Sequence, residues 1–138
     1  MGPVRGSRVL LAVYLGGVGG GLTRYGVTTA WPTPVGRFPW ATLTVNTGGV
    51  FALAVLATLL GRARSPNRYL RPLLGAGFLG AFTTFASVMV SVQQLTSSGD
   101  GVTAGTYLIV TVAAGFAAGW LGLRAGRGLG RRRPATAS

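Results

Sequence analysis

The chain contains no cysteine, no histidine and only one acidic residue, Asp100, among its 138 residues. Disulfide bonds, thiolate chemistry and imidazole metal ligands are therefore excluded. A pair of carboxylates for general acid and base catalysis is excluded too, because it needs two acids. These absences predict that the chain is not an enzyme.

The basic residues are 13 arginines, which give a formal net charge of +12. On a soluble chain such a charge would indicate binding to nucleic acid. Here, however, the arginines lie in short segments between long uncharged runs, and 49% of the residues are hydrophobic. This arrangement is typical of membrane proteins that follow the positive-inside rule. We therefore expect a bilayer and no nucleic acid as the surroundings of this chain.

Four apolar runs are long enough to cross a bilayer, for which about 20 residues suffice. They extend from Arg8 to Thr28, from Phe38 to Leu60, from Pro72 to Gly99 and from Val102 to Leu123. The sequence predicts an all-α membrane protein with four transmembrane helices over residues 9–123. Residues 1–8 would form an N-terminal cytoplasmic segment, and residues 124–138 an arginine-rich, disordered cytoplasmic tail.

Four spans place both termini on one side of the membrane. Eleven arginines would lie on that side, namely Arg5, Arg8, Arg62, Arg64, Arg68, Arg71, Arg124, Arg127, Arg131, Arg132 and Arg133. The other side would carry Arg37 and Asp100, with Arg24 within or near the first span. This asymmetry predicts a multi-pass protein of the plasma membrane with both termini in the cytoplasm.

The third run contains the sequence GAGFLGAFTTFASVMV over residues 75–90. Three glycines weaken the start of a helix there, and Thr83 and Thr84 place hydroxyl groups between two phenylalanines. Non-helical backbone in a membrane is tolerated only where protein or a water-filled path surrounds it. We therefore predict that the third helix is broken in mid-membrane, at a functional centre.

Few other polar side chains lie in the spans, and each has two interpretations. Arg24 is either a snorkelling residue at a helix end or a partner for an anion in a polar vestibule. Asn46 either hydrogen-bonds between helices or offers its amide to a pore. Tyr107 and Thr111, one helical turn apart, form either a packing stripe or a polar track beside a pore.

Glycine repeats predict close contact between helices. The first run carries five glycines over residues 16–21, and the fourth run carries the GxxxG pair Gly115 and Gly119.

Taken together, these residues resemble a subunit of the Fluc-type (CrcB) fluoride channels. The resemblance extends over roughly residues 9–123. It is carried by GGVGGGLTRY in the first span, TLTVNTGG in the second and GFLGAFTTF in the third. The last motif is the most specific, because glycines leading into Thr-Thr-Phe are rare in a four-span chain of this size.

The resemblance implies an antiparallel dimer with two narrow pathways that export fluoride passively and so lower its toxicity. It also implies a structural, non-transported Na+ at the dimer centre, bound by the backbone carbonyls of Gly80 and Thr83. Arg24 would make the vestibule positive. The fluoride pathway would be formed by Asn46, Thr84, Phe85, Ser87, Tyr107 and Thr111.

The chain departs from the family pattern, which is approximately GGLTTFSTF where residues 80–88 are GAFTTFASV. Ala86 replaces a serine, and Val88 replaces a second phenylalanine on the same helix face as Phe85. Family pathways draw these two rings from different subunits, so a homodimer of this chain would lack one ring in each pathway. The arginine bias should also fix a single orientation. We therefore predict an oppositely oriented paralogue as partner, with one pathway impaired; a homodimer is the alternative.

Two other functions, drug export and a structural role in the membrane, fit these residues less well than a channel. A small four-span drug exporter would have a similar size, but proton-coupled export normally needs an intramembrane carboxylate. A membrane scaffold that transports nothing would leave Asn46, Thr84 and Phe85 without a role.

Overall fold

The computed structural model describes residues 3–63 and 67–131, and these are helical apart from short connections. The elements in chain order are α1 (Pro3–Ala30), α2 (Trp40–Arg62), the π-helix η1 (Arg71–Leu79), α3 (Gly80–Phe82), α4 (Phe85–Ser97) and α5 (Gly101–Arg131). The protein is therefore all-α over the described residues.

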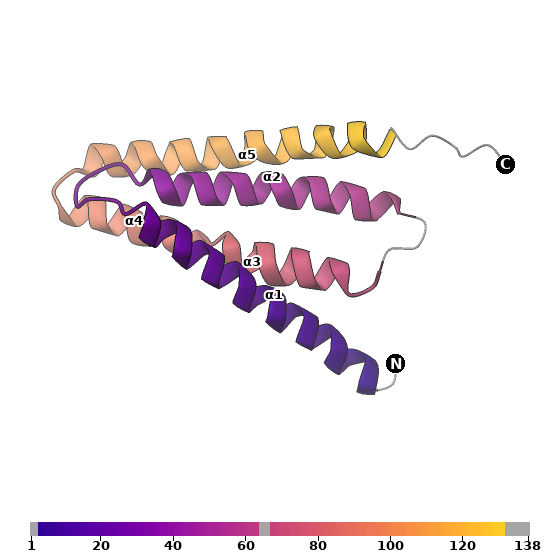
Figure 1. Ribbon diagram of the computed structural model, residues 1–138. Helices are drawn as coiled ribbons and strands as arrows, with labels where there is room; N and C mark the ends of the chain where they lie inside the picture. The colour runs from indigo at the N-terminus through magenta and orange to yellow at the C-terminus, as the bar shows by residue number, and fades with distance from the viewer. Residues whose placement is uncertain (1–2, 64–66, 132–138) are drawn as a thin grey trace.

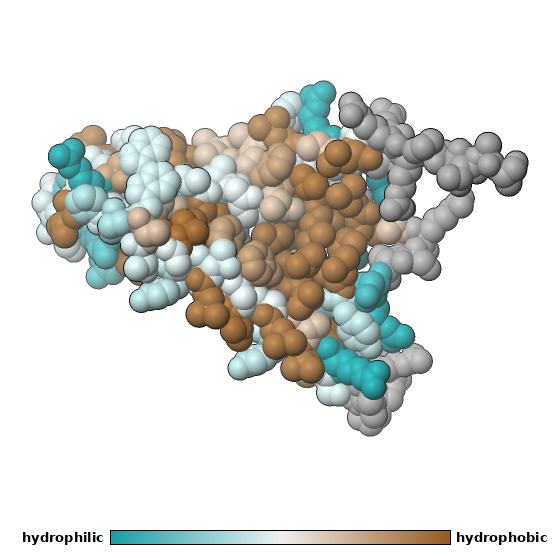
Figure 2. Space-filling model, viewed as in Figure 1, coloured by the Kyte–Doolittle hydropathy of each residue, from teal (hydrophilic) through white to brown (hydrophobic). Residues whose placement is uncertain are grey.

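The helices run alternately in opposite directions (Figure 1). The start of α1, the end of α2 and the end of α5 lie at one end of the molecule, and the α1–α2 and α4–α5 connections lie at the other. Figure 2 shows hydrophobic residues gathered in the middle and hydrophilic residues towards both ends on the face in view. This banding is what a bilayer requires of a protein that crosses it.

Three helical segments are long and apolar enough to cross a membrane, namely Trp40–Arg62, Arg71–Ser97 and Gly101–Leu129. The chain is thus a multi-pass membrane protein. Helix α1 is not among the three, because its glycines and Arg24 lower the mean hydropathy. A fourth span therefore remains a prediction.

The predicted ends of the helices are correct to within about two residues, with two exceptions. Helix α1 begins at Pro3, whereas residues 1–8 were predicted to precede the first span. Helix α5 continues to Arg131, whereas disorder was predicted from Arg124 onwards. That prediction is wrong for residues 124–131, because the apolar residues and glycines there keep α5 packed against α2. Gly126, for example, lies so close to Thr58 that an added Cβ would be 2.7 Å from the threonine Cβ. Residues 132–138 lie outside the described part.

Glycines set the closest helix contacts. Gly16 and Gly20 of α1 are buried against the backbone of η1, where an added Cβ would collide with the carbonyls of Leu73 and Phe78. On α5 the close contacts to α2 are made by Gly122 and Gly126. The predicted pair lies one to two turns away: Gly119 is in ordinary contact with Val50, and Gly115 has open space beside it. Within this chain, the closest glycine contacts of α5 therefore lie at another pair than the predicted one.

Substituting Gly20 by alanine should destabilise the protein by about 1–3 kcal/mol, the usual range for overpacking. The added methyl group would meet the Phe78 backbone, including its Cα at 3.0 Å, and backbone cannot move aside as a side chain can. Gly21→Ala is the matched control, since nothing lies within 4 Å of its Cβ position. Thermal unfolding in detergent measures both variants, and equal melting temperatures would contradict the packing described.

Candidate functional site

The helical chain between Arg71 and Ser97 is interrupted at two threonines. Thr83 (φ −101°, ψ 120°) and Thr84 (φ −135°, ψ 131°) both have extended backbone angles. The Thr84 hydroxyl oxygen then accepts a hydrogen bond from the Ser87 amide at 3.1 Å and lies 2.9 Å from the Ser87 hydroxyl. Thr84 is thus the N-cap of α4, a position at which threonine is favoured.

The interruption frees backbone carbonyls. In a continuous helix the amides of Thr84 and Ser87 would donate to the carbonyls of Gly80 and Thr83. Here the Thr84 amide donates to Asn46 Oδ1 at 3.2 Å, and the Ser87 amide donates to the Thr84 hydroxyl. The carbonyls of Gly80 and Thr83 therefore lack their usual helical donors.

Asn46 of α2 lies directly against the interruption and is 9% exposed. Besides accepting from the Thr84 amide, it donates from Nδ2 to the Thr84 carbonyl at 3.2 Å. Arg24 of α1 joins the cluster, because its NH1 donates to Asn46 Oδ1 at 2.9 Å and to the Phe82 carbonyl at 2.7 Å. The guanidinium is therefore directed towards the interruption and does not extend towards the end of its own helix, α1.

An apolar groove of about 720 Å³ opens beside this cluster, between α2, α4 and α5. Phe85 is its most conspicuous member at the interruption, with 67% of its surface exposed. The groove is lined by Asn46, Thr47, Val50, Thr83, Thr84, Phe85, Val88, Thr111, Val112, Gly115, Phe116, Gly119, Trp120 and Leu123. The same apolar groove thus contains the polar side chains of Asn46 and Thr84 and the exposed ring of Phe85.

Two buried hydroxyl groups on α5 have no hydrogen-bond partner among the described residues, those of Tyr107 and Thr111. Tyr107 is fully buried and packs edge-on against Phe38, with ring centroids 5.3 Å apart. A buried polar group without a partner is costly, so each such group calls for a ligand, a water or an ion.

Val88 and Phe85 differ in environment although both line the groove. Val88 is 2% exposed and belongs to the core cluster that includes Leu43, Leu95 and Tyr107. Ala86, in contrast, is exposed. The side chain at position 88 therefore contributes chiefly to the core of this chain, while Phe85 offers its ring to the groove.

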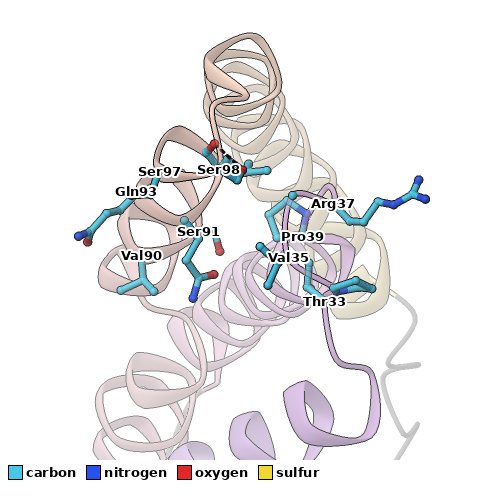
Figure 3. A pocket seen from close by; sticks show the side chains of 13 residues that line it. Thr33, Val35, Arg37, Pro39, Val90, Ser91, Gln93, Ser97 and Ser98 are labelled. Carbon is cyan, nitrogen blue, oxygen red and sulfur yellow. Dashed lines mark hydrogen bonds between the residues drawn. The ribbon is translucent and has the colours of Figure 1, made fainter.

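A second pocket, of about 540 Å³ (Figure 3), lies at the end of the molecule that holds the α1–α2 and α4–α5 connections (Figure 1). It is formed by residues 33–39 of the α1–α2 connection and by the second half of α4. Its one charged lining residue, Arg37, points away from the hollow (Figure 3). This pocket is therefore less suited to an anion than the surroundings of Arg24.

Most predicted site residues meet at the interruption. Arg24, Asn46, Thr84 and Ser87 form one hydrogen-bonded cluster, and Thr83, Phe85 and Thr111 line the adjoining groove. Gly80 is exposed and lies on a neighbouring apolar groove, between α2 and η1.

Two features of the site escaped the sequence analysis. The Phe82 carbonyl accepts a hydrogen bond from Arg24, which is 58 positions away in the sequence. Local sequence patterns cannot predict a contact between residues so far apart. Ser91, which is 7% exposed, donates its hydroxyl to the Ser87 carbonyl at 3.0 Å. Its spacing of four residues from Ser87 on one helix could have indicated it.

Comparison with known proteins identifies the family. The family described as CrcB-like protein, Camphor Resistance (CrcB), matches residues 11–123. The fluoride-specific ion channel FluC 2 of Nocardia farcinica is 46% identical over 119 residues, which cover 86% of this chain and 85% of that protein. FluC of Paracoccus denitrificans is 40% identical over 123 residues, covering 89% and 98% respectively. FluC 3 of Streptomyces avermitilis is 45% identical over 119 residues, covering 86% and 58%. The chain therefore belongs to the CrcB-like family, whose relatives named here are fluoride-specific ion channels and not enzymes.

Proposed function

We propose that this chain is a subunit of a channel that lets fluoride leave the cytoplasm passively. The observation that carries this proposal is the hydrogen-bonded cluster of Arg24, Asn46 and Thr84 beside a groove with the uncovered ring of Phe85. The names of the relatives support fluoride as the ion.

The chemistry of the groove suits a small, strongly hydrated anion. A selectivity pathway must replace the water shell of the ion with protein groups. On the groove, donors are supplied by Asn46, Thr84 and Thr111, whose hydroxyl has no partner among the described residues. Ser87 extends the cluster along α4, whereas Tyr107 is fully buried and does not line the groove. The edge of the Phe85 ring carries the positive part of the aromatic quadrupole, so an anion can rest there without a full countercharge. Arg24 makes the approach positive.

A dimer is proposed because the groove is open and apolar on this chain alone. Phe85, Phe116 and Trp120, all in its lining, are 67%, 78% and 55% exposed. Lipid would cover these apolar rings, but it offers no hydrogen-bond partner to the polar side chains of Asn46, Thr84 and Thr111 in the same groove. An antiparallel second subunit would cover the groove and convert it into a narrow pathway.

The freed carbonyls fit a structural Na+ at the centre of such a dimer. Oxygen ligands suit hard cations, and the Gly80 and Thr83 carbonyls have lost their helical donors. An added Cβ at Gly80 would meet its nearest neighbour in this chain at 3.6 Å, so packing within the chain does not require glycine there. We propose that these two carbonyls hold the ion and that it only joins the subunits.

We further propose that the second subunit is an oppositely oriented paralogue. The arginine bias should fix this chain in one orientation, with both termini in the cytoplasm. Streptomyces avermitilis has two relatives of this chain, FluC 3 and a FluC 2 distinct from that of Nocardia farcinica. Paralogues therefore exist within this family.

The drug-exporter alternative finds no support at the site. Asp100, the one acid of the chain, lies in the α4–α5 connection and accepts a hydrogen bond from the Thr103 amide at 2.9 Å. Hydrogen bonds from the Thr103 side chain and, to a lesser extent, from the Thr103 amide lower the pKa of Asp100. A carboxylate held ionised at the start of a helix is a capping group, and it is poorly placed to carry protons across a membrane.

The proposed function is tested by fluoride efflux from liposomes, measured with an ion-selective electrode. The chain is reconstituted alone and together with a FluC paralogue encoded by the same genome, and chloride efflux serves as the control. We expect fluoride but not chloride to leave the liposomes that hold both chains, without a proton gradient. Absence of fluoride efflux in both preparations would overturn the proposal.

A further inference from the structure

The guanidinium of Arg24 occupies the place of a missing helical donor. In a continuous helix the Phe82 carbonyl would accept from the amide of residue 86, but the extended Thr83 and Thr84 intervene. Arg24 NH1 donates to this carbonyl instead, at 2.7 Å. A carbonyl at a helix end inside a membrane needs such a donor, since no water is at hand in the lipid.

The same nitrogen fixes the orientation of the Asn46 amide. Asn46 Oδ1 accepts from Arg24 NH1 at 2.9 Å and from the Thr84 amide at 3.2 Å. A flipped amide would set its NH2 group against these two donors and turn its oxygen to the Thr84 carbonyl. The two donors therefore select one of the two orientations.

That orientation matters for an anion. The NH2 group has two hydrogens, and one donates to the Thr84 carbonyl. The other has no hydrogen-bond partner among the described residues, and this side chain lines the groove. In the observed orientation, the second N–H of Asn46 is available to donate to an anion in the groove. With the amide free to rotate, a carbonyl oxygen would face the groove for part of the time and repel an anion.

We infer that Arg24 is a positioning residue, which orients the Asn46 amide and holds the interruption between α3 and α4. This role goes beyond a positive charge at the approach to the groove. It rests on the proposed function only insofar as the anion is fluoride.

A double-mutant cycle on fluoride efflux separates positioning from charge. Arg24→Leu should slow efflux by about tenfold or more, the factor expected for losing hydrogen bonds from a charged group. Asn46→Ala should be at least as slow. If Arg24 acts through Asn46, the double variant is no slower than Asn46→Ala alone. Arg37→Leu is the matched control, because Arg37 points away from its pocket (Figure 3), and it should leave efflux unchanged. Multiplicative effects of the two substitutions would overturn the inference.

Hydrogen exchange tests the same role without fluoride. In detergent, Arg24→Leu should raise exchange in peptides covering residues 82–88 by about tenfold, as expected for losing roughly 1.4 kcal/mol of local protection. Peptides of α5 should not change. Should Arg24→Leu unfold the protein, Arg24→Lys decides, because it keeps the charge but not the planar fork of donors. Unchanged exchange over residues 82–88 in a folded variant would refute the positioning role. A wild type that moves no fluoride would remove the proposed function and leave this measurement standing.

Discussion

Replacing Phe85 by isoleucine is expected to slow fluoride efflux from liposomes that hold this chain with its partner subunit. Isoleucine keeps an apolar side chain of similar reach but has no ring, and hence no positive ring edge to stand in for the water shell of the ion. Edge-on interactions of aromatic rings contribute about 0.5–1.5 kcal/mol. Because every 1.4 kcal/mol is a factor of ten, a loss of up to about tenfold should follow.

The stability of the protein should hardly change, since Phe85 is 67% exposed and contributes little to the core. Phe51→Ile is the matched control. Phe51 is 40% exposed on α2 and does not line the groove, so its substitution should preserve efflux. Efflux at the wild-type rate with isoleucine at position 85 would show that the ring takes no part in conduction.

The sequence predicted the helices and the composition of the site better than the contacts within the site. The apolar runs predicted most helix ends to within a few residues, because hydropathy follows directly from residue type; the start of α1 and the end of α5 were the exceptions. The region of Thr83 and Thr84 stood out because glycines and hydroxyl groups are unusual within a long apolar run. The helix ends and the unusual region around Thr83 and Thr84 could be predicted because both depend only on residue type and local spacing.

The contacts depend on how helices pack, which local patterns do not determine. Arg24 binds residues 22 and 58 positions away along the chain, so its two sequence-based interpretations could not be separated. For the same reason, the closest glycine contacts of α5 within this chain lie at another pair than the predicted one. Gly115 and Gly122 look alike in the sequence, yet only the latter faces α2. The tail was misjudged because charge was weighed above the helix-forming and packing residues between the arginines.

Val88 shows how the structure refines a sequence argument. Its replacement of a phenylalanine was interpreted as the loss of one ring from a pathway. In the structure this side chain is 2% exposed and packs in the core with Tyr107. A phenylalanine here would have to displace core neighbours or project into the groove. The core of this chain is therefore built around the smaller residue, and the missing ring must come from another chain if the pathway needs it.

If that ring is needed, the chain alone should pass little fluoride, and an oppositely oriented paralogue should restore efflux. Tags on either terminus, probed in intact cells, should be found only in the cytoplasm. In the inverted orientation the eleven arginines would lie outside the cytoplasm, contrary to the positive-inside rule. The two orientations should therefore not coexist.

The two measurements contradict the partner proposal in different ways. Equal populations of both orientations would permit a homodimer, and efflux from the chain alone as fast as from the pair would show that a homodimer suffices. In that case position 88 needs no aromatic ring, and Phe85 with the donors of Asn46 and Thr84 would form a complete pathway. If the chain is silent alone and active with its paralogue, the two chains supply different parts of one pathway. Phe85 is then this chain's contribution, and the ring absent at Val88 is its partner's.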